Sequence, residues 1–125
     1  MNEITARMSE NERKDFPDIV ETTSLKGLMK LYPKSSSDKK KAIEHRCWEL
    51  LEDVTLLEGI DKAYDEYASA FEHLIDARCF ELLQLSTDVN KLKEERSRED
   101  ISEWLGGLIS ARILELQPQG CAAVR

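Results

Sequence analysis

Glycine and proline are scarce in this sequence, and signals for β-structure are missing. The 125 residues include five Gly and three Pro. No stretch alternates apolar and polar residues with period two, and no Asn-Gly or Asp-Gly dipeptide marks a hairpin. A chain of this length suits one domain around one core. We therefore expect a single all-α domain over residues 1–125.

Long hydrophobic runs are also missing. The apolar runs are only a few residues long, whereas a transmembrane helix needs about 20. The opening stretch, MNEITARMSENERKDF, has no apolar region of the kind found in secretory signals. These absences predict a cytoplasmic protein, or one inside an infected host cell, with no membrane partner.

Cysteine and histidine are few and poorly spaced for a disulfide framework or a metal site. Cys47, Cys79 and Cys121 are odd in number and form no CxxC motif, which fits a reducing compartment. A tetrahedral zinc site can be built from two His and two Cys, and the chain has these in His45, His73, Cys47 and Cys79. However, His45 and Cys47 are two apart and point to opposite sides of a helix. We expect no metal and no cofactor.

Helical periodicity fills most of the chain. Apolar residues recur at helical spacing after Ser24, after the linker KSSSD at residues 34–38, from Ile60 and from Ile101. A break near Gly59 is expected because an unbroken helix from 37 to 86 would be about 75 Å long. The pattern predicts a bundle of three to four main helices. Residues 1–16 are expected either to form a short helix or to fray. Residues 91–100 are expected to form a charged linker, and residues 117–125 a loose tail.

A short motif occurs twice, as RCWELL at residues 46–51 and as RCFELL at residues 78–83. The two regions do not align beyond these six letters, and repeat architectures need at least three copies. The motif is therefore interpreted as two core-facing turns of helix.

Acidic residues dominate one segment. The net charge of the chain is −7, and residues 49–76 alone carry nine acidic groups and one basic group. Such a segment attracts basic proteins or divalent cations. A solvated helix face is the simpler interpretation.

Spaced carboxylates in this segment resemble those of the all-α nucleoside-triphosphate pyrophosphatases of the MazG type. Those enzymes bind Mg²⁺ through ExxE and ExxD pairs on successive helices, and the ion holds the substrate phosphates. Glu49 and Glu52 match ExxE, whereas Glu72 and Asp76 have the spacing ExxxD. No phosphate loop, nucleophile elbow or HExxH motif is present. A Mg²⁺-dependent nucleotide pyrophosphohydrolase is therefore the second alternative function.

A second resemblance rests on Thr22-Thr23-Ser24-Leu25-Lys26. This stretch is similar to the start of a helix in the small helical subunits of CRISPR effector complexes. The resemblance implies nucleic acid as a partner within a complex. Lys39, Lys40 and Lys41 would then contact phosphates.

Large aromatic side chains point to an interaction function. Trp48 and Phe80 fall beside the main apolar stripes of their helices, and interfaces are enriched in such rings. The sequence thus predicts a non-enzymatic interaction or adaptor protein that binds a protein partner or itself. The candidate contact residues are Trp48, Glu52, Asp53, Glu66, Asp76 and Phe80.

Overall fold

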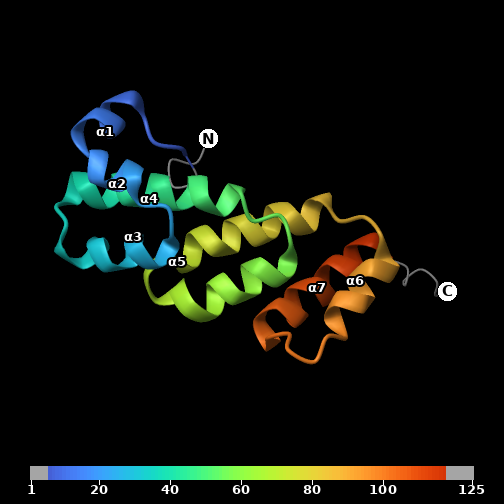
Figure 1. Ribbon diagram of the computed structural model, residues 1–125. Coiled ribbons are helices and arrows are strands. Elements are labelled where there is room, and N and C mark those ends of the chain that lie inside the picture. The colour runs from blue at the N-terminus through green and yellow to red at the C-terminus, as the bar shows by residue number, and fades with distance from the viewer. Residues whose placement is uncertain (1–5, 118–125) are drawn as a thin grey trace. The chain divides into compact units, whose positions relative to one another are not determined.

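Helices alone make up the regular structure of residues 6–117, the part of the chain that this computed structural model describes. The expected all-α fold is confirmed for these residues. Beyond Gln117, the expected tail lies outside the described part. The elements, labelled in Figure 1, are α1 (Glu10–Asp15), α2 (Pro17–Glu21), α3 (Leu25–Leu31), η2 (Tyr32–Lys34), α4 (Ser37–Glu52), α5 (Leu57–Leu85), α6 (Val89–Arg96) and α7 (Glu103–Leu116).

Short polar side chains cap the amino ends of the main helices. Ser24 and Ser36 each accept a hydrogen bond from the backbone N–H three residues ahead, at the starts of α3 and α4. These bonds satisfy N–H groups that have no partner within the helix. At the start of α7, Ser102 accepts a hydrogen bond from the N–H of Leu105 in the same way.

Helix forms both in residues 1–16, where a short helix or fraying was expected, and in residues 91–100, where a linker was expected. Residues 1–16 contain α1, which is closed by a reciprocal capping box between Ser9 and Glu12. Residues 91–100 contain most of α6, which Asp88 caps by accepting two backbone N–H bonds. The linker expected at residues 91–100 was wrong because a charged stretch can still form a helix when its end is capped and one side chain, here Leu92, is buried.

The helix pattern breaks close to Gly59, as expected. α4 ends at Glu52, residues 53–56 form the connection, and Gly59 lies in the first turn of α5. A Cβ at Gly59 would come within 2.8 Å of Val54 Cγ1. Glycine therefore lets the connection fold closely over the start of α5.

A second break, not expected, interrupts α5 at Phe71. Its backbone angles, φ −129° and ψ 29°, are not helical. Figure 1 shows the ribbon reversing direction here, so α5 consists of two arms. The Phe71 ring is fully buried and meets Tyr32 edge to face, with ring centroids 5.5 Å apart. Burial of this ring offsets the lost helical hydrogen bonds.

Three helix pairs follow one another along the chain. α3 packs against α4, the two arms of α5 form the second pair, and α6 packs against α7 (Figure 1). The second helix of each pair carries Arg-x-x-Glu-Leu, at residues 46–50, 78–82 and 112–116. LIDARCFEL, residues 74–82, and LISARILEL, residues 108–116, agree at six of nine positions. The three pairs therefore share this motif in their second helix.

The repeated motif combines core packing with a second role. Cys47 and Cys79 are fully buried, so the interpretation as core-facing turns is confirmed for these positions. The third copy, RILEL, was missed because Ile113 stands where the other copies have cysteine. The motif thus occurs at three places in the described residues.

The motif arginines close the carboxyl ends of preceding helices. Arg46 Nε donates to the carbonyl oxygen of Thr22, the C-cap of α2, over 3.0 Å. Arg78 donates to three carbonyl oxygens at the end of α4, of Leu51, Glu52 and Val54. Arg112 donates to two carbonyl oxygens at the end of α5, of Gln84 and Ser86. The last carbonyl groups of a helix lack partners within it, and the planar guanidinium supplies several donors at once.

The chain divides into two compact units, residues 1–78 and residues 79–125. The expectation of a single domain stays a prediction. The described part of the first unit buries apolar side chains from α2 to α5, among them Ile19, Leu28, Ile43, Leu51, Ile60 and Leu74. The second unit has its own core of Cys79, Leu82, Leu83, Leu92, Leu105, Ile109 and Ile113.

Between residues 6 and 117, no helix combines the length and the apolar character needed to cross a membrane.

Candidate functional site

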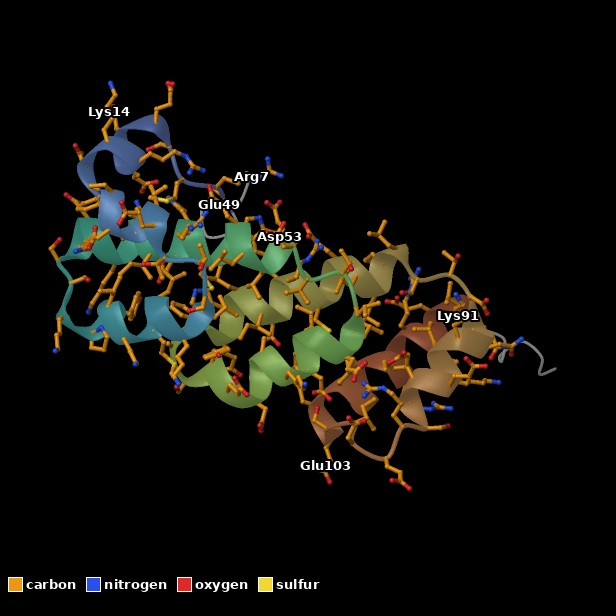
Figure 2. All side chains as sticks on the ribbon, in the orientation of Figure 1. Arg7, Lys14, Glu49, Asp53, Lys91 and Glu103 are labelled. Carbon is orange, nitrogen blue, oxygen red and sulfur yellow. The ribbon has the colours of Figure 1, made fainter. Side chains whose placement is uncertain are left out.

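One face of α4 is covered by the N-terminal segment, residues 6–21. Glu52 accepts two bonds from the guanidinium of Arg7, the shorter at 2.7 Å. Glu49 pairs with Arg13, which belongs to α1. Figure 2 shows Arg7 and Glu49 close together where the N-terminal segment meets α4, whereas Lys14 points away.

Glu49 is the centre of this contact. One oxygen accepts from Arg46 of its own helix over 2.9 Å, and the other accepts from Arg13 and from the backbone N–H of Met8. The carboxylate side chain is only 10% exposed. A nearly buried charge of this kind is stable because every oxygen has a charged or N–H partner.

A histidine–carboxylate contact adds to the same face. His45 Nδ1 lies 2.8 Å from Glu12 Oε1, and both side chains are largely buried. Burial opposes ionisation of Glu12, but the N–H of Ser9 and the ring of His45 both bond to its carboxylate. The net result is a Glu12 pKa below its ordinary value.

Trp48 belongs to this covered face. It is spaced three residues from His45 and four from Glu52, so the three side chains share one side of α4. His45, Glu49 and Glu52 on this side of the helix all bind residues 7–13. The ring is only 3% exposed. The expectation that Trp48 lies outside the core is therefore wrong.

The acidic candidates are spread over separate elements. Asp53 lies in the connection after α4, Glu66 in the first arm of α5 and Asp76 in the second arm. Asp53 and Glu66 are exposed, and Asp76 is half-buried. Within residues 6–117, no three His, Cys, Asp or Glu side chains gather closely enough to hold a metal ion.

The basic candidates lie in the first turns of α4. Lys39 Nζ is 2.7 Å from Asp18 Oδ2, and Lys40 Nζ lies over the Tyr32 ring, 5.3 Å from its centroid. Lys41 is exposed. Lys39 and Lys40 are therefore both engaged by side chains of the same chain.

A surface pocket of about 350 Å³ opens at the connection between α4 and α5. Its charged lining residues are all exposed, so it offers no buried polar group that would orient a ligand. The lining consists of Asp53, Val54, Thr55, Leu56, Glu58, Gly59 and Lys62.

Phe80 is the aromatic candidate that the structure leaves accessible. It lies on the second arm of α5 and is 62% exposed, which confirms that its ring is outside the core. Leu85 and Leu114, in the same unit, are 77% and 69% exposed. The unit formed by residues 79–117 thus presents three large apolar side chains to solvent, and these are the strongest candidate binding groups.

Comparisons of the chain with protein-family models, with curated proteins and with solved structures find no match.

Proposed function

We propose that this chain is a non-enzymatic interaction protein that binds a protein partner through the exposed face of α5 around Phe80. The observation that supports the proposal is the 62% exposure of an aromatic ring on a well-formed helix. Exposed rings are costly in water and are enriched at the centres of interfaces. The cytoplasmic location expected from the sequence belongs to the same proposal.

The surroundings of Phe80 suit a binding face. Its neighbours Glu81 and Gln84 are also exposed and lie one and four residues further along the helix. An apolar centre with a polar rim is the usual composition of a protein interface. Behind it, Cys79, Leu82 and Leu83 are buried, so the face is held on a packed helix and needs little ordering on binding.

A photo-crosslinking experiment tests this proposal. A photoreactive phenylalanine analogue replaces Phe80 in the full chain expressed in its native cells, and a matched variant carries it at Leu56. Leu56 is 67% exposed and lies in the other unit, so it controls for exposure alone. We expect one defined protein adduct at position 80 and none at position 56. Equal labelling at both positions would refute a specific interface at Phe80.

The two alternative functions stay predictions, without a specific observation in their favour. For the nucleic-acid alternative, Lys39 and Lys40 are engaged by Asp18 and Tyr32. For the pyrophosphohydrolase alternative, arginines bind both carboxylates of the ExxE pair.

A further inference from the structure

The N-terminal segment contacts α4 in two different ways, before and after Phe16. After Phe16, α2 packs directly against α4, and Ile19 is fully buried. Arg46 of α4 donates to the carbonyl oxygen of Thr22, the C-cap of α2. A buried apolar side chain and a bonded helix end thus anchor α2.

Before Phe16, the contact with α4 is made mainly by charged side chains. Three pairs of side chains join the two parts, and they are Arg7 with Glu52, Arg13 with Glu49, and Glu12 with His45. Within residues 6–16, which the structure describes in full, Met8 alone is buried. The six residues of α1 bury no side chain. Little apolar burial therefore supports this part of the segment.

Charged pairs of this kind hold the stretch weakly. The side chains of Arg7 and Arg13 are 70% and 41% exposed. Ion pairs that are open to solvent contribute little stability, and salt screens them. A helix of six residues does not persist on its own in water. Residues 6–16 thus have the features of a stretch that opens locally, ahead of the rest of its unit.

Opening does not leave a buried charge without a partner. Glu49 is the most buried carboxylate in the contact, and Arg46 of its own helix donates to it over 2.9 Å. Because this pair lies within α4, it persists when Arg13 leaves. The main cost of separating a buried ion pair is therefore avoided.

Phe16 is the point at which the two parts can separate. It ends α1 and precedes α2, and its backbone angles, φ −130° and ψ 65°, are not helical. Pro17 follows, and a proline disfavours helical angles in the residue before it. The junction is thus a fixed break between two helices, and hinges use residues at such element ends.

We propose that residues 6–16 form a flap, closed on α4 by its charged pairs, which opens at Phe16 while α2 stays bound. Opening withdraws two arginines from Glu49 and Glu52 and makes this face of α4 more negative. The flap thus controls access to the start of the acidic segment, residues 49–76. This inference concerns α4 and is independent of the proposed interface at Phe80.

Residue-resolved amide hydrogen exchange of the full chain, followed by NMR, tests the flap. The N–H groups of Met8 and Arg13 both have acceptors in the closed state and report on the flap. The N–H of Thr22 bonds to the carbonyl oxygen of Ile19 and reports on α2. We expect high salt to speed exchange of the flap amides several-fold and to leave that of Thr22 unchanged.

A charge swap tests the pairing that holds the flap. Arg7→Glu places like charges opposite each other at Glu52, and it should speed exchange of the flap amides several-fold at low salt. Adding Glu52→Arg should restore slow exchange, because the pair is re-formed with opposite polarity. Asp18→Lys is the matched control, since it reverses the charge opposite Lys39 on the α2 side. It should leave the flap amides unchanged.

Three results would overturn the inference. The first is exchange at Thr22 that rises with salt as much as exchange at Arg13, which would mean that the whole N-terminal segment detaches. The second is flap exchange that salt leaves unchanged, which would mean that charge does not hold the flap closed. The third is failure of Glu52→Arg to restore slow exchange in the Arg7→Glu variant. None of the three would affect crosslinking at Phe80.

Discussion

Arg78 donates a hydrogen bond to the carbonyl oxygen of Leu51 over 3.0 Å and so ties the second arm of α5 to the end of α4. The same guanidinium also reaches Glu52 and Val54. A single side chain thereby satisfies the carboxyl end of a helix formed 24 to 27 residues earlier. The first and third copies of the motif repeat this arrangement through Arg46 and Arg112.

Replacement of Arg78 should destabilise the fold strongly. Arg78→Ala removes the guanidinium donor from three carbonyl oxygens, of which that of Leu51 keeps a backbone donor, the N–H of Val54. We expect a loss of about 2–3 kcal/mol in the free energy of unfolding. Arg78→Lys should lose part of this, because an ammonium group cannot span the same acceptors. The measurement is urea denaturation followed by circular dichroism.

Arg96→Ala is the matched control for this prediction. Arg96 is exposed and makes one side-chain bond, to Ser110 Oγ over 3.0 Å. Its loss should cost less than about 1 kcal/mol. Equal losses for Arg78→Ala and Arg96→Ala would show that closing the end of α4 contributes little.

Acid should loosen the N-terminal segment from α4. The pKa of Glu12 in the folded protein is lowered from its ordinary value of 4.5. A lowered folded pKa gives stability that is present above the ordinary value and is lost as the pH falls through the folded value. We expect the fluorescence of Trp48 to shift toward that of an exposed indole below about pH 4, in a Trp104→Phe background.

Glu12→Gln tests whether this carboxylate is responsible. Glutamine keeps the capping-box bond to the Ser9 N–H but cannot titrate. The variant should therefore show a smaller fluorescence change over the same pH range. A transition of the same size and midpoint in the variant would assign it to other groups.

Cys47 should be unreactive in the folded protein. Burial, with a further contribution from the nearby charge of Glu44, raises the pKa of its thiol well above the ordinary value. The thiolate is the reactive form, and the side chain is fully buried. In a Cys79→Ala, Cys121→Ser variant, a thiol reagent should react only as fast as the protein unfolds. Rapid reaction in native buffer would contradict the burial of Cys47.

The glycines of the chain should respond in opposite ways to alanine. A Cβ at Gly106 or Gly107 meets no atom within 4 Å, and both lie inside α7. Alanine at either site should raise the free energy of unfolding by up to about 1 kcal/mol. At Gly27 a Cβ would come within 2.8 Å of Thr22 Cγ2, so Gly27→Ala should be destabilising. Thermal melts of the three single variants check the signs.

Local chemistry made much of the fold predictable. The helix starts at Ser24 and Ser36 and the break near Gly59 follow from capping groups and backbone preferences within a few residues. The same local reasoning failed for α6, because a charged composition does not reveal that Leu92 reaches a core.

The candidate site could be predicted only in part from such local patterns. Trp48 and Phe80 occupy the same place in the motif, so the sequence predicts the same exposure for both side chains. Trp48 is buried, Phe80 is exposed, and the helix that carries Trp48 binds Arg7 and Arg13 across 45 and 36 positions of the chain. No local pattern specifies which of two similar helix faces such a segment covers.

The amino-acid sequence by itself determined the all-α class, the helix starts and the repeated Arg-x-x-Glu-Leu positions, since these depend on neighbours along the chain. Only the tertiary structure decided that α5 reverses at Phe71, that the motif arginines close distant helix ends, and that Trp48 is covered whereas Phe80 is not. The physical reason is that these features depend on contacts between residues far apart in sequence. Their free energy comes from burying rings and pairing carbonyl groups that become neighbours only when the chain folds.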